Sequence, residues 1–270
     1  MNQCQELGFF NSNFVYFPLP KKSTGVRFTY DLAIGSLTIT STTEVPFGLY
    51  ARLALIAMTN LAFRSKENPV KSFTVYKLLH DLRWYKPSGL QLCKFANQLV
   101  NWSTTLITMM YRTEERTSVK NLVLIDSAEF KLEKDLEDDM HVYLQFTDSG
   151  RDFLIESAFP IPLEALQKVK CAFDLDTLAW LISSVYQVSK TNTPRLINWE
   201  NLYEQFVISQ KNQSKFKTNF STSLYEMKLN FYSDARVTRT PEGIQIFPSP
   251  LLTKERSRSC LMIPNLGGQQ

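Results

Sequence analysis

The feature that most constrains the fold is an order of predicted elements that occurs twice along the 270 residues. In the first half, helical patterns are followed by short alternating runs that are typical of strands. Two strands are predicted over 26–30 and 36–40, then helices over 47–65, 73–82 and 90–102, then strands over 106–112, 121–127 and 141–146. Three helices followed by a hairpin form the winged-helix layout, a helix-turn-helix with a β-hairpin wing.

The second half repeats this order of elements without repeating the sequence. Helices are predicted over 163–170, 174–188, 199–206 and 215–232, and strands over 235–240 and 244–249. The last two strands meet at Pro241-Glu242-Gly243, a strong turn signal. We therefore expect an α+β chain with two tandem winged-helix domains, each a helix-turn-helix bundle with a β-hairpin wing.

Proline placement suggests where the two halves divide. Phe159-Pro160-Ile161-Pro162 cannot continue a helix, so we place the division near residues 150–159. The first twenty-five residues show no clear period and are expected to be irregular. The expected domains are an N-terminal extension (1–36), a first winged helix (37–155), a second winged helix (156–252) and a flexible tail (253–270).

The long helix of the second half carries the main candidate site. Its apolar residues recur at helical spacing, and polar and cationic residues occupy the other positions. Lys stems reach phosphates, whereas Asn, Ser and Thr can also address base edges. The candidate DNA-binding residues are Lys211, Lys215, Lys217, Thr218, Asn219, Ser221, Thr222 and Lys228 around this helix, with Arg236 and Arg239 on the following wing. The alternative is a plain polar outer face of an amphipathic helix.

Charge supports the choice of the second half. Residues 160–270 carry 13 Lys and Arg against 9 Asp and Glu, which accounts for the net charge of +4 of the whole chain. In the first half, Lys77, Arg83 and Lys94 could contact flanking phosphates, although an ordinary solvated surface explains them as well. The four tryptophans lie among apolar neighbours and are expected in the core.

The sequence favours a binding protein over an enzyme. It contains no phosphate-binding glycine loop, zinc-protease motif or nucleophile elbow, and only two histidines. Four scattered cysteines give no metal-ligand spacing, so no metal, cofactor or catalytic residue is expected. A metal-dependent nuclease using Asp135, Asp138 and Asp139 of the acidic segment 129–139 is a third alternative. No run is long and apolar enough to span a membrane, so a cytoplasmic protein is expected.

Three segments resemble the plasmid-encoded RepA-type replication initiator family. Residues 45–66 resemble the opening helix of these proteins, and 197–206 with 215–250 resemble their end. The shared pattern is a Trp-x-x-Leu-x-x-x-Phe helix, a long helix, a Tyr-x-x-Ala strand and a closing Pro-Ser-Pro. The likeness covers about residues 37–252. The chain departs from it at Val207, where a glycine often stands, and at Leu251, where a second proline does.

The resemblance implies an initiator that binds repeated double-stranded DNA at a plasmid origin and helps to open it. It also implies a host replication initiator and a helicase as partners, a homodimeric form, and a place on plasmid or nucleoid DNA in the bacterial cytoplasm. The first domain would form the dimer or touch flanking DNA, and the second would read the repeat. The alternative function is a winged-helix transcriptional repressor that regulates its own gene.

Overall fold

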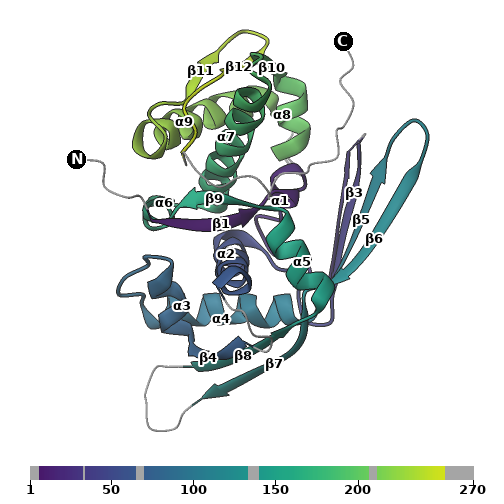
Figure 1. Cartoon of the computed structure of the whole chain (residues 1–270), viewed down its shortest axis with the longest axis vertical. Coiled ribbons are helices and arrows are strands. Elements are labelled where there is room, and N and C mark those ends of the chain that lie inside the picture. The colour runs from purple at the N-terminus through teal and green to yellow at the C-terminus, as the bar shows by residue number, and fades with distance from the viewer. Residues whose placement is uncertain (1–5, 33, 65–69, 133–139, 207–211, 253–270) are drawn as a thin grey trace.

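The structure is a computed structural model that describes residues 6–32, 34–64, 70–132, 140–206 and 212–252 (Figure 1). The helices are α1 (Asn13–Tyr16), α2 (Gly48–Arg64), α3 (Val75–Asp81), α4 (Gly89–Ser103), α5 (Asp148–Glu156), α6 (Leu163–Lys168), α7 (Ala172–Thr191), α8 (Trp199–Phe206) and α9 (Gln213–Phe231). The strands are β1 (Leu7–Asn11), β2 (Arg27–Leu32), β3 (Gly35–Ser41), β4 (Val70–Thr74), β5 (Thr105–Arg112), β6 (Thr117–Val123), β7 (Ile125–Leu132), β8 (Met140–Phe146), β9 (Ala158–Pro162), β10 (Arg195–Asn198), β11 (Arg236–Arg239) and β12 (Gly243–Phe247).

The two halves share one arrangement of elements. In the first, α2 is followed by β4, α3 and α4, and β4 forms a three-stranded sheet in the order β4-β8-β7. In the second, α7 is followed by β10, α8 and α9, and the sheet order is β10-β12-β11. The first set occupies the lower part of Figure 1 and the second set the upper part. The chain is thus a mixed α+β protein whose arrangement is consistent with winged-helix-like domains.

A four-stranded sheet, β2-β3-β5-β6, adds to the first half and projects beside it (Figure 1). The prediction of one strand over 121–127 is wrong, because the chain changes sheets inside that range. β6 pairs with β5 and ends at Val123, whereas β7 pairs with β8 from Ile125. Between them the buried Leu124 accepts a hydrogen bond from the Thr147 amide, so its carbonyl leaves the first ladder.

The N-terminal segment is part of the folded protein, so the prediction of irregular structure there is wrong. β1 pairs antiparallel with β9, joining Leu7 to Pro162 and Asn11 to Ala158. Two prolines are tolerated in β9 because the ribbon has only two strands, and each strand needs donors on one side alone. The segment expected to separate the halves therefore holds helix α5 and strand β9, while the domain limits themselves remain a prediction.

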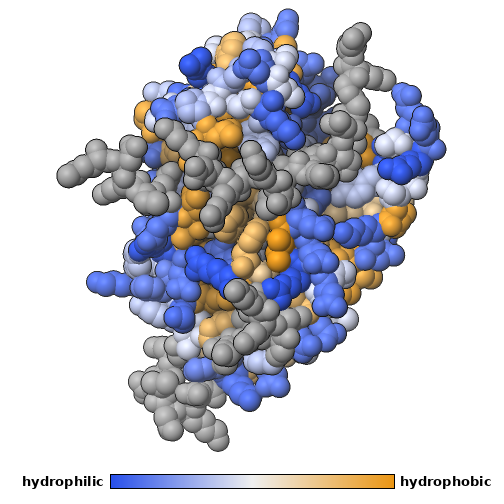
Figure 2. All heavy atoms as spheres, in the orientation of Figure 1, coloured by the Kyte–Doolittle hydropathy of each residue, from blue (hydrophilic) through white to orange (hydrophobic). Residues whose placement is uncertain are grey.

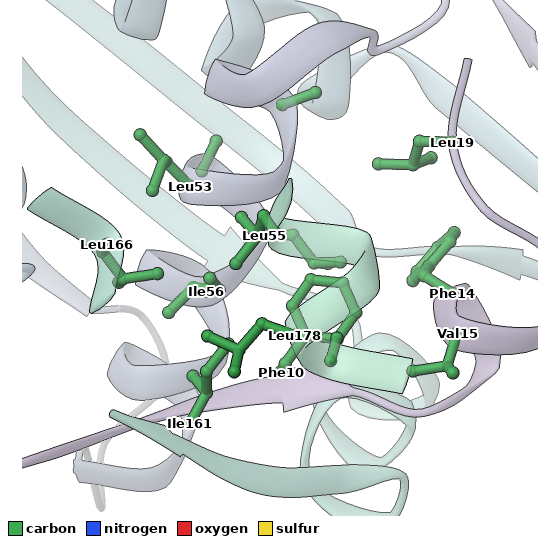
Figure 3. Packing of buried hydrophobic residues seen from close by; sticks show 14 of the residues in the cluster. Phe10, Phe14, Val15, Leu19, Leu53, Leu55, Ile56, Ile161, Leu166 and Leu178 are labelled. Atoms are coloured by element: carbon green, nitrogen blue, oxygen red, sulfur yellow. The ribbon is translucent and has the colours of Figure 1, made fainter. Parts of the chain in front are cut away.

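The hydrophobic core runs without interruption from the first half to the second. Figure 3 shows Phe10 of β1 and Ile161 of β9 packed with Ile56 of α2 and Leu178 of α7. The β1-β9 ribbon thus lies where the first helices of the two halves meet, and its apolar side chains fill the space between them. Burying such side chains is the dominant favourable term in folding.

A buried ion pair crosses the same junction. Arg52 of α2 donates from Nε to Oδ1 of Asp176 at 2.6 Å and from Nη2 to Oδ2 at 2.7 Å. Arg52, only 1% exposed, also donates to the carbonyls of Leu19 at 2.7 Å and Gly48 at 2.8 Å. Burial raises the pKa of the Asp176 carboxyl, and the Arg52 charge opposes that rise. The pair fixes α2 against α7, and an arginine within an apolar helix is its signal in the sequence.

Replacing Asp176 by Leu leaves the Arg52 guanidinium buried without its counter-charge, so we expect the free energy of unfolding to fall by about 3–5 kcal/mol. The double variant Arg52→Met/Asp176→Leu is expected to lose less than the sum of the two single losses, since it leaves no unpaired charge. Urea-induced unfolding of the two single variants and the double variant measures this. Strictly additive losses would contradict a coupled pair.

Candidate nucleic-acid interface

Helix α9 has one buried face and one exposed face. Its first turn is capped by the Asn212 side chain, which accepts a hydrogen bond from the Lys215 amide at 3.0 Å. The predicted apolar stripe is confirmed: its five members, Phe216, Phe220, Leu224, Met227 and Phe231, are all buried. Nineteen residues make a helix about 28 Å long, enough to lie along a major groove.

An aromatic cluster sets the orientation of α9. The Phe220 ring lies 5.2 Å from that of Trp180 in α7, 5.0 Å from Phe206 and 6.3 Å from Trp199, both in α8. These rings meet edge to face, a favourable geometry for aromatic pairs. The prediction of core tryptophans is confirmed for Trp180, Trp199 and Trp102, whereas Trp84 is half-buried.

Most candidate residues of α9 lie on its outer side. Lys215, Thr218, Asn219 and Thr222 are exposed, and Lys217, Ser221 and Lys228 are half-buried. Two hydroxyls donate back to the helix, Thr218 to the Ser214 carbonyl at 3.3 Å and Ser221 to the Lys217 carbonyl at 2.7 Å. Their oxygens can still accept hydrogen bonds. Lys211 lies outside the described residues.

The wing brings one of its arginines, Arg239, to Trp199 at the start of α8. Arg236 and Arg239 of β11 are both exposed. The Arg239 guanidinium carbon lies 5.8 Å from the centre of the Trp199 ring, and the Lys217 ammonium lies 5.9 Å from it. One indole therefore holds a cation from the helix and a cation from the wing through cation–π contacts. The sequence predicted Trp199 in the core, and its contact with both cations follows from three elements meeting there.

Hydrogen bonds fix the wing to the start of α8, and the close approach of β12 to β10 fixes it further. The Trp199 indole donates to the Thr240 carbonyl at 3.2 Å, and its amide donates to the Glu242 carbonyl at 3.0 Å. A Cβ at Gly243 would lie 2.0 Å from the Ile197 carbonyl oxygen, so only glycine allows β12 to pair this closely with β10. The wing is consequently held in a set position relative to α9.

Asn219 and Thr222 lie on a different flank of α9 from Lys217. They line a cavity of about 410 Å³ beside the start of α7, together with Lys21, Cys171 and Asp174. Ser223 donates to Asp174 there at 2.8 Å. Burial lowers the pKa of Lys21 and raises the pKa of the Cys171 thiol. The Asp174 carboxylate lines the same cavity as Asn219, so a phosphate at that point would meet a like charge.

The first-half candidates are spread over α3, the turn after it and α4. Lys77 and Lys94 are exposed, whereas Arg83 is half-buried and pairs with Glu6. These elements lie in the lower part of Figure 1, away from α9. The structure therefore does not bring them into one site with the candidates of the second half.

Two further residues of α9, outside the predicted site, have large exposed side chains. Tyr225 is 65% exposed and Leu229 is 60% exposed, and they follow Thr218 and Thr222 at helical spacing. Large apolar side chains exposed in this way extend the outer face of the helix. The signal in the sequence was their spacing from the buried stripe, which places them on the opposite side.

Within the described part of the chain, no group of three or more His, Cys, Asp or Glu side chains could hold a metal ion. The acidic residues Asp135, Asp138 and Asp139 lie outside the described residues. Among the helices that the structure describes, none combines the length and the apolar composition that a membrane span requires.

Two crystal structures of domains 2 and 3 of RctB resemble the chain in fold. A selenomethionine derivative matches with a TM-score of 0.60 and 11% sequence identity, over 88% of this chain and 98% of that one. The other matches with a TM-score of 0.56 and 11% identity, over 86% and 94%. No protein-family model matches the sequence, and no curated protein does either.

Replacing Phe220 by Ala removes the ring shared by α7, α8 and α9, so we expect the free energy of unfolding to fall by about 3–5 kcal/mol. Tyr225→Ala on the exposed face of the same helix is the matched control and should change it by at most about 0.5 kcal/mol. Denaturant unfolding measures both. Similar losses in the two variants would contradict the described orientation of α9.

Proposed function

We propose that this chain is a replication initiator that binds repeated double-stranded DNA at an origin through α9 and the β11-β12 wing. The observation that carries the proposal is the meeting of Lys217 and Arg239 on the Trp199 ring. A helix in the major groove and a wing on the neighbouring backbone need cations at their junction, where both elements approach phosphates. RctB, whose domains the fold resembles, is a replication initiator of Vibrio chromosome II.

We further propose that the two halves act as tandem winged-helix domains, with recognition in the second (156–252). Lys215, Lys217, Arg236 and Arg239 would bind phosphates, and Thr218 and Thr222 would face base edges. The visible surface of this half is mostly hydrophilic (Figure 2). No catalytic step is assigned to the chain.

The first half is the proposed homodimer surface. The sheet β2-β3-β5-β6 exposes Leu106, Val119 and Val123 on β5 and β6, and β6 is an edge strand. Apolar side chains next to unpaired backbone groups favour pairing with another chain.

We propose a plasmid origin as the target and a host replication initiator and helicase as partners in the bacterial cytoplasm.

Selection from random duplex DNA, sequenced at two salt concentrations, tests the function. We expect enrichment of a site that occurs as tandem direct repeats, with affinity that falls steeply as salt rises. An inverted repeat would instead support the transcriptional repressor. Absence of both enrichment and salt-dependent binding would contradict DNA recognition.

Variants of α9 test the assignment of roles on the selected site. Lys217→Ala should weaken binding to all sequences and reduce the slope of log affinity against log salt by about one. Asn219→Ala should cost about 1–3 kcal/mol on the selected site and little on other sequences, because a base contact carries specificity. Lys131→Ala, an exposed lysine on β7, is the control and should change neither quantity. Unchanged binding in both α9 variants would remove the helix from the interface.

A further inference from the structure

A second surface with the chemistry of a ligand site lies at α3 and the turn that follows it. The Tyr76 and His80 rings are stacked, with centroids 6.1 Å apart and planes at 27°. The Tyr85 ring meets His80 edge to face at 5.0 Å. Tyr76 is 40% exposed and Tyr85 is 45% exposed, and His80 is exposed as well. We call these three rings the aromatic strip.

Cations accompany the aromatic strip. Lys77 and Lys86 are exposed beside it, and the Arg83 guanidinium carbon lies 5.8 Å from the Tyr85 ring centre. Arg83 also donates to the Tyr85 hydroxyl and pairs with Glu6. Residues 76–86 carry three cations and the carboxylate of Asp81, and Glu6 adds a second carboxylate by pairing with Arg83, which leaves one net positive charge. The surface therefore combines two partly exposed tyrosine rings with the exposed cations Lys77 and Lys86.

The backbone of the turn holds Tyr85 in its exposed position. Arg83 has φ of 64° and Lys86 has φ of 54°, left-handed values that are uncommon outside glycine. Gln167 of α6 donates to the Arg83 carbonyl and so fixes the turn from outside. Trp84 turns inward to Tyr50, with ring centroids 6.0 Å apart, and its neighbour Tyr85 turns outward. Such backbone strain persists only where surrounding contacts impose it.

We propose that the aromatic strip binds single-stranded DNA by stacking unpaired bases on Tyr76 and Tyr85. Bases in a duplex stack on one another, so exposed ring faces serve strands whose bases are free. Base–aromatic stacking with cations on the backbone is the common mode of single-strand binding, and it tolerates any sequence. Lys77 and Lys86, exposed and next in sequence to the two tyrosines, would contact the phosphates of the bound strand.

The site is distinct from the proposed duplex interface. It uses α3 and its turn, whereas duplex binding uses α9 and the wing in the other half of the chain (Figure 1). A protein partner would call for a continuous apolar patch, but here the rings alternate with charged side chains. The inference does not rest on duplex recognition, so each can fail without the other.

Binding of the full chain to fluorescently labelled oligothymidine, followed by anisotropy, tests the proposal. Tyr76→Ala and Tyr85→Ala should each weaken binding by about 5- to 150-fold, the range for loss of one stacked base. Tyr85→Phe should bind as the unchanged chain does, because the ring face remains. Val26→Ala, at an exposed apolar residue outside the strip and outside α9, is the control and should have no effect. Thermal unfolding of each variant checks that it folds.

Two further arms separate stacking from general electrostatic attraction. An oligonucleotide of the same length without bases should bind weakly, and Tyr76→Ala should leave that binding unchanged. Quenching of a 2-aminopurine base within oligothymidine should accompany binding and be lost in the double variant Tyr76→Ala/Tyr85→Ala. Equal affinity for the base-free strand, or unchanged oligothymidine binding in the double variant, would overturn the proposal.

Duplex binding measured on the same variants keeps the two functions apart. The strip variants should bind the selected duplex normally, whereas Lys217→Ala should bind oligothymidine normally. Failure of the unchanged chain to bind oligothymidine, while it binds duplex, would overturn the aromatic strip alone. Oligothymidine binding without duplex binding would overturn the proposed function and support the strip.

Discussion

The buried pair of Arg52 and Asp176 constrains the relation between the two halves. An arginine at 1% exposure is tolerable only because a carboxylate and backbone carbonyls take up its donors. Hydrophobic packing between α2 and α7 alone would tolerate small rotations, since burial of apolar area has little directionality. The two parallel hydrogen bonds between guanidinium and carboxylate do not tolerate them, and they fix which faces of the helices meet.

Within the second half, the packing of aromatic rings determines which side chains reach the exposed surface. Phe220 packs on Trp180 and Trp199, so the face of α9 that points outward is decided in the core. Trp199 then contacts the wing through its indole and backbone amide, and holds Lys217 and Arg239. The cations of the proposed interface are thereby pre-organised, which reduces the entropy lost when DNA binds.

Periodicity in the sequence predicted seven of the described helices and the buried stripe of α9, because both depend on local spacing, but it did not predict the short helices α1 and α5. It did not predict the β1-β9 ribbon, whose strands lie far apart in the chain and one of which, β9, contains two prolines that argue against pairing. The change of sheets at Leu124 was equally out of reach, since alternation along a strand does not identify its neighbour. For the candidate site, the sequence was enough to predict the polar and cationic residue types and the face of α9 on which they lie. The meeting of Lys217 with Arg239 on one indole requires the tertiary structure.

The β1-β9 ribbon also bears on how the chain acquires its structure during synthesis. Leu7 pairs with Pro162, so β1 leaves the ribosome long before its partner strand exists. At about 5–20 residues per second, the intervening chain takes roughly 8–30 s to make. Phe10, buried in the finished protein, must remain soluble or be shielded for that time. The nascent first half is therefore an incomplete globule that closes only once β9 has emerged.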